Sequence, residues 1–207
     1  MNIKYLVASP GRTGSIFVTH TIAQSLGYKV VFDNNLLITP APKNNIPVIY
    51  HSHDATLQFD EDIIVIQPYR KNIFNAIVSA VISEEYREWN NYTGNKQPFA
   101  ADLEIFKEQY IWHRYWDKVF TQSTKYNNRI NLCFDDFIGD SQKVCLSLNI
   151  PLTSYTSIIS PYKNNVLNIT ELEEYYKQLE QEFTADIPEL FKEINSKKII
   201  KNTYEQK

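Results

Sequence analysis

The chain has 207 residues, of which 43% are hydrophobic and 22% charged, and its formal net charge is −3. This composition is typical of a globular domain with its own core and argues against a protein dominated by binding to nucleic-acid phosphates. No apolar run reaches the roughly 20 residues of a membrane-spanning helix, and Gly11, Arg12 and Gly14 interrupt any signal-peptide core. We therefore expect a cytoplasmic protein without nucleic-acid or membrane partners.

Strands and helices alternate along the chain. Apolar runs predict strands at 4–8, 28–32, 46–50, 62–67 and 129–134, and helical spacing predicts helices at 15–26, 72–89, 100–124, 139–148 and 170–194. Alternation of this kind predicts an α/β fold: a three-layer, mainly parallel sheet flanked by helices, in one domain over 1–207 that ends in a helical segment over about 170–194. Pro188 is expected to break or kink that last helix.

The first segment with site character is the turn Pro10–Ser15, between the first strand and the first helix. Gly11 and Gly14 let the backbone approach an anion, and helix N-terminal amides favour negative charge. Arg12 and the hydroxyls of Thr13 and Ser15 add hydrogen-bond donors. A glycine turn of this kind is equally typical of a tight strand–helix connection. It differs from the nucleotide-triphosphatase loop because no lysine follows Gly14.

Two histidines follow the strand predicted at 46–50. His51 and His53 lie where the carboxyl edge of the sheet is expected, which is the edge where open α/β sheets bind ligands. A histidine in that position can act as a general base near neutral pH. Asp54, directly after His53, is a carboxylate alternative.

A second cationic segment follows the strand predicted at 62–67. Arg70 and Lys71 precede a helix that carries a polar stripe at helical spacing, made of Asn72, Asn75, Ser79 and Ser83. Two cations beside hydroxyl groups suit a second phosphate. The alternative is a helix N-terminus with two solvated cations. Because cations are mildly unfavourable there, we expect an anion to compensate them.

Other polar or reactive residues are interpreted as structural. Cys133 and Cys145 are expected to be free buried thiols, and His20 and His113 to be packing residues. The stretch 90–98 is expected to be a surface connection rather than a lid over a site.

In this order, the three segments resemble the sulfotransferase family that uses 3′-phosphoadenosine-5′-phosphosulfate. Arg12-Thr13-Gly14-Ser15 matches the family's 5′-phosphosulfate loop, and Lys71 with Ser79 eight positions on matches its 3′-phosphate segment, with Arg70 one residue out of register. A histidine base follows an intervening strand in many members, and the register favours His53. Residues 130–137 and 146–151 resemble the family's late strand, acidic turn and helix.

The resemblance implies a P-loop NTPase-like topology and metal-free transfer of a sulfuryl group to an acceptor hydroxyl or amine. It assigns catalysis to His53 and Arg12, and donor binding to Gly11, Arg12, Thr13, Gly14, Ser15, Arg70, Lys71 and Ser79. The family's C-terminal basic glycine loop is missing, and Lys163 is its nearest substitute. The alternatives are a P-loop phosphotransferase, such as a small nucleoside kinase, and a non-catalytic nucleotide- or partner-binding module that uses the aromatic helix 105–120 as its surface.

Overall fold

The computed structural model describes residues 3–32, 47–54, 63–87, 96–121, 128–156, 162–183 and 187–192. The chain divides into two compact units, which we describe separately. Unit 1 comprises Met1–Ala76 and Gln122–Ile159, and unit 2 comprises Ile77–Thr121 and Ser160–Lys207. Residues 34–45 and most of the stretch at 90–98 lie outside the described residues.

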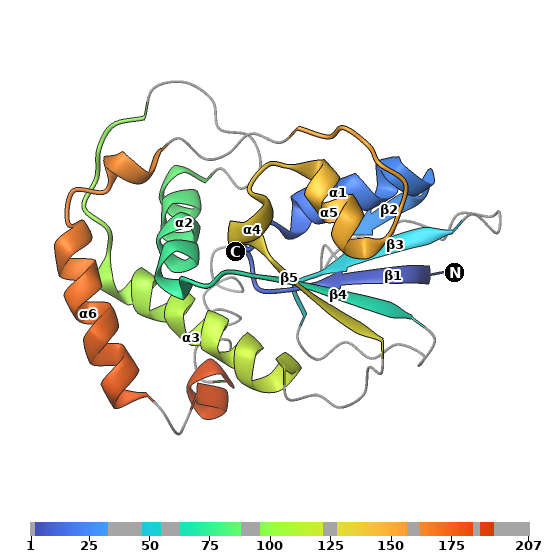
Figure 1. Cartoon of the computed structure of the whole chain (residues 1–207). Helices are drawn as coiled ribbons and strands as arrows, with labels where there is room; N and C mark the ends of the chain where they lie inside the picture. Colours follow the sequence, from blue (N-terminus) through green and yellow to red (C-terminus); the bar gives the residue numbers. More distant parts are fainter. Residues whose placement is uncertain are drawn as a thin grey trace, which may run out of the picture. The chain divides into compact units, whose positions relative to one another are not determined.

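Unit 1 is built on a five-stranded, all-parallel sheet (Figure 1), which confirms the α/β class. The strands have the spatial order β2-β3-β1-β4-β5, and their bounds are Ile3–Ala8 (β1), Lys29–Phe32 (β2), Val48–Ser52 (β3), Ile64–Tyr69 (β4) and Arg129–Cys133 (β5). All five predicted strands are present. β3 and β4 both begin and end two residues later than predicted. His51, which was expected to follow its strand, therefore lies within β3.

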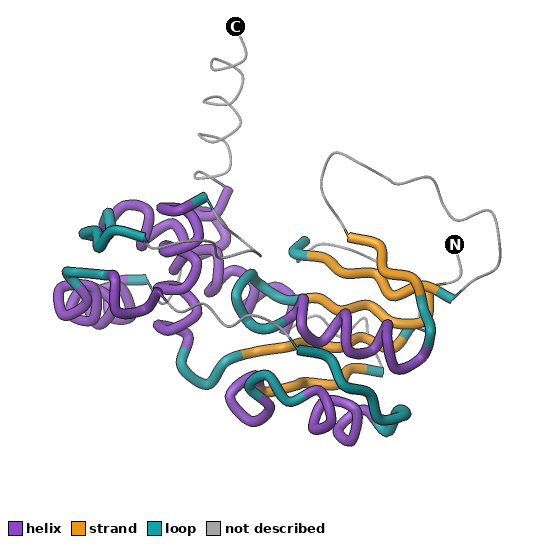
Figure 2. Tube along the Cα trace, turned by 90° about the horizontal axis from the view of Figure 1, so that it is seen from above, coloured by secondary structure: helices purple, strands orange, loops and turns teal. Residues whose placement is uncertain are grey.

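The helices of unit 1 are α1 (Ser15–Leu26), α4 (Phe134–Phe137) and α5 (Ser141–Leu148). α1 has the predicted bounds because Gly14 and Gly27 flank it in left-handed conformations, with φ of 84° and 66°. It packs on the sheet with α5 alongside it (Figure 2). α5 begins two residues later than predicted because the Asp140 carboxylate caps it, accepting the backbone N–H groups of Gln142 and Lys143.

The order of the strands fixes where a site can form. After β1 the chain crosses to β2 at one edge of the sheet, and after β4 it leads to β5 at the other edge. β1 and β4 are neighbours, so the segments that follow them diverge. Such a switch point opens a crevice at the carboxyl ends of the strands. The two cationic segments of the sequence follow these two strands.

Unit 2 is helical. α2 (Ile73–Tyr86) runs into it from unit 1, and it contains α3 (Leu103–Thr121), a short 3₁₀ helix η1 (Tyr162–Asn165) and α6 (Ile169–Glu182). The prediction of one helix over 170–194 is wrong, because α6 ends at Glu182 and a separate helical stretch covers 187–192. Pro188 lies in the first turn of that stretch, where its missing N–H costs nothing. None of the helices within the described ranges is long and apolar enough to cross a membrane.

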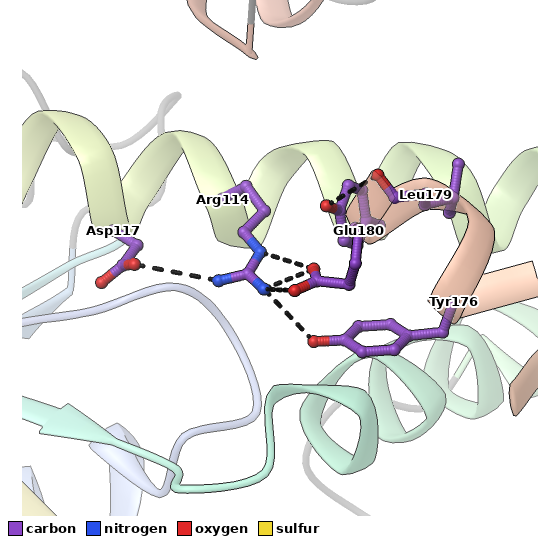
Figure 3. Close-up of polar contacts among 6 residues, drawn as sticks. Arg114, Asp117, Tyr176, Leu179 and Glu180 are labelled. Atoms are coloured by element: carbon purple, nitrogen blue, oxygen red, sulfur yellow. Dashed lines mark hydrogen bonds and ion pairs between the residues drawn. The ribbon is translucent and has the colours of Figure 1, made fainter. Parts of the chain in front are cut away.

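Within unit 2, an ion pair joins α3 to α6 (Figure 3). The Arg114 guanidinium donates to the Glu180 carboxylate from both Nε and a terminal nitrogen, and it also donates to the Tyr176 hydroxyl at 3.4 Å. Burial alone would lower the pKa of Arg114, but hydrogen bonds and charge interactions with Glu180, Tyr176 and Tyr110 together outweigh burial and raise it. Much of α3 belongs to the core of unit 2. The buried residues of this aromatic helix are Phe106, Tyr110, Ile111, His113 and Trp116.

Candidate functional site

The loop between β1 and α1 has the backbone geometry of an anion-binding turn. Arg12 and Gly14 have φ of 66° and 84°, and the φ of Thr13 between them is not positive. Alternation of this kind turns successive backbone N–H groups toward one concave side. Gly14 precedes α1 without a side-chain cap, and the first turn of α1 has no acidic residue. The N–H groups of that turn are therefore suited to an external anion.

Two hydroxyl groups of this loop hydrogen-bond within it. Thr13 Oγ1 donates toward Ser9 Oγ at 2.7 Å and the Pro10 carbonyl at 3.0 Å, and Ser9 Oγ donates to the same carbonyl at 3.0 Å. The single hydroxyl proton of Thr13 is thus used inside the loop. Its hydroxyl therefore holds the shape of the loop, and of the two hydroxyls named from the sequence, Ser15 is the better donor to a ligand.

Two arginines, Arg12 and Arg70, interact electrostatically at the switch point. Burial, followed by repulsion from Arg70, lowers the pKa of Arg12 to about 10. Burial also lowers the pKa of Arg70, and the nearby carboxylate of Asp135 partly offsets this effect. Two half-buried cations that repel each other at the end of a nest of N–H groups favour binding of an anion.

Phe134, the first residue of α4, contacts both the cation after β4 and the loop after β1. The Arg70 guanidinium lies over the Phe134 ring, 4.5 Å from its centroid. The same ring packs on Gly14 so closely that a Cβ on the glycine would lie 2.1 Å from Phe134 Cδ2. Arg70 Nε is buried and has no hydrogen-bond partner within the part of the chain that the structure describes. Phe134 thus links the loop after β1 to the cation after β4.

Lys71 points away from this cluster. Its backbone N–H donates to the Asp135 carboxylate at 2.8 Å, and its ammonium group pairs with Asp136 at 2.7 Å on an exposed surface. The hydrogen bond to Asp136 raises the pKa of Lys71. Of the two cations named from the sequence, Arg70 is therefore the one beside Arg12. Ser79 is half-buried in the part of α2 that belongs to unit 2.

His51 in β3 and His53, just after it, lie against the same loop. His51 Nε2 is 3.0 Å from Ser15 Oγ, and His53 Nδ1 is 2.7 Å from the Ser9 carbonyl oxygen. A carbonyl oxygen only accepts, so His53 carries its proton on Nδ1 and a neutral ring presents Nε2 as a proton acceptor. The two rings are in edge-to-face contact, with centroids 4.7 Å apart.

His51 differs from His53 in its environment. It is 3% exposed, and burial, followed by the nearby His53 and His20, lowers its pKa to about 3. A ring that stays neutral at physiological pH with Nε2 against Ser15 is poorly placed to accept an acceptor's proton. Asp54 lies at the edge of the cluster, where its backbone N–H donates to Ser52 Oγ at 2.9 Å.

No model of a known protein family matches this chain, and no curated protein matches it. The geometry of unit 1 therefore carries the functional argument. That geometry brings together Arg12, Thr13, Gly14, Ser15, His51, His53 and Arg70. It also adds Phe134 and Asp135, which the sequence analysis did not place in the site. Lys163 lies in η1, and its side chain is outside what the structure describes.

Proposed function

We propose that unit 1 is the catalytic core of a sulfotransferase that uses 3′-phosphoadenosine-5′-phosphosulfate. One observation carries this proposal: Arg12 and Arg70 follow the neighbouring strands β1 and β4, beside the nest of N–H groups before α1, and are near enough for Arg70 to lower the pKa of Arg12. An apolar ligand would not compensate two half-buried cations, whereas a ligand with two phosphate groups would.

The residues fit a nucleotide with two separate anionic groups. The loop amides, Arg12 and Ser15 suit the phosphosulfate, because they combine a cation with oriented backbone donors. Arg70 suits the 3′-phosphate, since its buried Nε needs an acceptor. In this proposal the strand order is that of a P-loop NTPase-like fold, and Lys71 and Ser79 are at most secondary contacts.

The contacts of Ser15 favour sulfuryl over phosphoryl transfer. A magnesium-dependent P-loop needs a lysine followed by a hydroxyl that binds the metal. Here Ser15 follows Gly14 directly, and its Oγ lies 3.0 Å from a histidine ring nitrogen. The positive charge that a metal would supply to the leaving group comes instead from Arg12.

His53 is the proposed general base, and Ser9 fixes its tautomer. The Ser9 carbonyl holds the proton on Nδ1, so Nε2 is the ring nitrogen that would take the proton of the acceptor hydroxyl or amine. When bound, the nucleotide supplies the sulfuryl group: a bond from the acceptor to sulfur forms while the bond from sulfur to the 5′-phosphate oxygen breaks, and that oxygen keeps the electron pair. Arg12 and the loop amides stabilise the charge that develops there.

The decisive experiment is calorimetry of the purified protein with 3′-phosphoadenosine 5′-phosphate. We expect metal-independent binding that is much tighter than binding of adenosine 5′-phosphate, which lacks the second phosphate. ATP with magnesium is the matched comparison for the kinase alternative. Tighter binding of ATP, or no binding of the bisphosphate, contradicts the proposal. Binding without sulfate transfer from radiolabelled donor to a broad acceptor panel favours a non-catalytic module.

A further inference from the structure

The buried pair Ser15–His51 contains one more proton than its own hydrogen bond uses. Ser15 is 2% exposed and His51 is 3% exposed, and the only side-chain hydrogen bond of either residue within the described residues is the one between them, at 3.0 Å. The pair holds two donors, one hydroxyl proton and one ring N–H, because the low pKa of His51 keeps the ring neutral. A single hydrogen bond uses only one of these two protons.

The position of the second proton depends on the tautomer. If Ser15 donates to His51 Nε2, the ring proton is on Nδ1, for which the described residues offer no acceptor, in a residue that is 3% exposed. If His51 donates from Nε2, the spare proton is on the Ser15 hydroxyl, at the first residue of α1 and beside the nest formed by Arg12 and Gly14. Buried N–H donors are rarely left unpaired, whereas an unpaired ring nitrogen acceptor costs less.

We propose that His51 is a positioning residue: it donates from Nε2 to Ser15 Oγ and so directs the Ser15 hydroxyl proton at the bound anion. This inference rests on the proposed function, since it assigns the anion to the phosphosulfate end of the nucleotide. The serine then acts as a donor of fixed direction, which needs no reorganisation when negative charge arrives. His51 and His53 thus have different tasks and opposite tautomers, with the proton on Nε2 in one ring and on Nδ1 in the other.

Nitrogen-15 NMR of the histidine rings tests the tautomer directly in the wild-type protein. We expect one histidine with a protonated Nε2 and an unprotonated Nδ1, assigned to His51 because it disappears in His51→Gln, and another with the opposite pattern, absent in His53→Asn. A proton on Nδ1 of His51 overturns the inference. This measurement needs no ligand, so it determines the direction of the Ser15–His51 hydrogen bond whether or not the protein binds the nucleotide. Failure of the wild type to bind the nucleotide would count against the proposed function instead.

Binding of 3′-phosphoadenosine 5′-phosphate to variants tests the consequence. Ser15→Ala is expected to weaken Kd about tenfold, and His51→Leu about three- to tenfold, because the serine loses its fixed direction. His51→Gln can donate from nearly the same position as Nε2 and should stay within twofold of wild type. His51→Leu should have no further effect when Ser15 is already alanine. If His51→Leu binds as well as wild type or better, His51 competes for the serine proton and the inference is wrong.

The matched control is Thr21→Val, which removes another buried hydroxyl of α1. Thr21 donates to the Phe17 carbonyl at 2.8 Å within the helix and is not part of the site. The Kd of Thr21→Val for 3′-phosphoadenosine 5′-phosphate should equal that of the wild type. If Thr21→Val weakens binding as much as Ser15→Ala does, the effect is not specific to Ser15 and the inference is wrong.

Discussion

Phe134 lies against Gly14 at a distance that excludes any side chain on the glycine, since the nearest ring carbon would be 2.1 Å from a Cβ. The contact joins residues that are distant in the sequence, one after β5 and one before α1. Because the same ring lies under the Arg70 guanidinium, the shape of the loop and the position of the cation depend on one aromatic side chain.

A series of glycine substitutions separates this contact from backbone strain. Gly11→Ala has free space and no positive φ, Gly27→Ala has free space with φ of 66°, and Gly14→Ala combines φ of 84° with the clash. We expect Gly11→Ala to be near neutral and Gly27→Ala to cost about 1–2 kcal/mol in free energy of unfolding. Gly14→Ala should cost about 1–3 kcal/mol more than Gly27→Ala. Urea denaturation measures all three, and equal costs for Gly14 and Gly27 would show that Phe134 can move aside.

The neighbouring cations after β4 offer a direct comparison. Arg70→Met should weaken binding of 3′-phosphoadenosine 5′-phosphate about tenfold or more, because a charge-assisted hydrogen bond to phosphate is lost at a half-buried site. Lys71→Met should change Kd less than threefold, since its ammonium group is exposed and paired with Asp136. Calorimetry of both variants decides the matter, and the reverse ranking would assign the phosphate to Lys71.

The proposed base can be removed while its anchor is kept. His53→Asn retains a donor that can reach the Ser9 carbonyl but has no group that accepts a proton at neutral pH. We expect turnover of the radiolabelled donor to fall about 10²–10⁴-fold with Kd for the nucleotide unchanged. Asp54→Asn is the matched control for the carboxylate alternative and should keep most of the activity. A His53→Asn enzyme with full turnover would exclude His53 as the base.

The sequence predicted the α/β class, the parallel sheet and the bounds of α1, because these depend on local signals such as apolar runs and the glycines at 14 and 27. It placed the cationic segments after the correct strands. It could not choose between Arg70 and Lys71, because the choice depends on Phe134, Asp135 and Asp136 at the end of β5. The end of α6 at Glu182 was not predicted either, because apolar residues continue at helical spacing past Phe183.

His51 predicts a specific pH dependence of stability. Its folded pKa of about 3 lies below the ordinary value of 6.5, so below pH 6.5 the unfolded chain binds a proton that the folded protein does not. Stability from this group is therefore complete above pH 6.5 and is lost as pH falls toward 3, by about 2 kcal/mol between pH 7 and pH 5. His20, whose pKa is also lowered by burial, adds a change of the same sign. Urea denaturation at both pH values should give a smaller difference for His51→Gln, and an unchanged difference would mean that His51 titrates normally.

The ion pair of unit 2 predicts a stability effect that is independent of the site. Arg114 and Glu180 are 24% and 34% exposed, so Arg114→Met leaves a partly buried carboxylate without its main partner and should cost about 1–3 kcal/mol in free energy of unfolding. Arg114→Met combined with Glu180→Met should recover most of that loss, because no charge is left uncompensated. The exposed pair of Lys192 with Glu189 is the control, and Lys192→Met should not change the melting temperature measurably. If the double variant is no more stable than Arg114→Met, the pair itself, rather than the stranded carboxylate, holds α3 to α6.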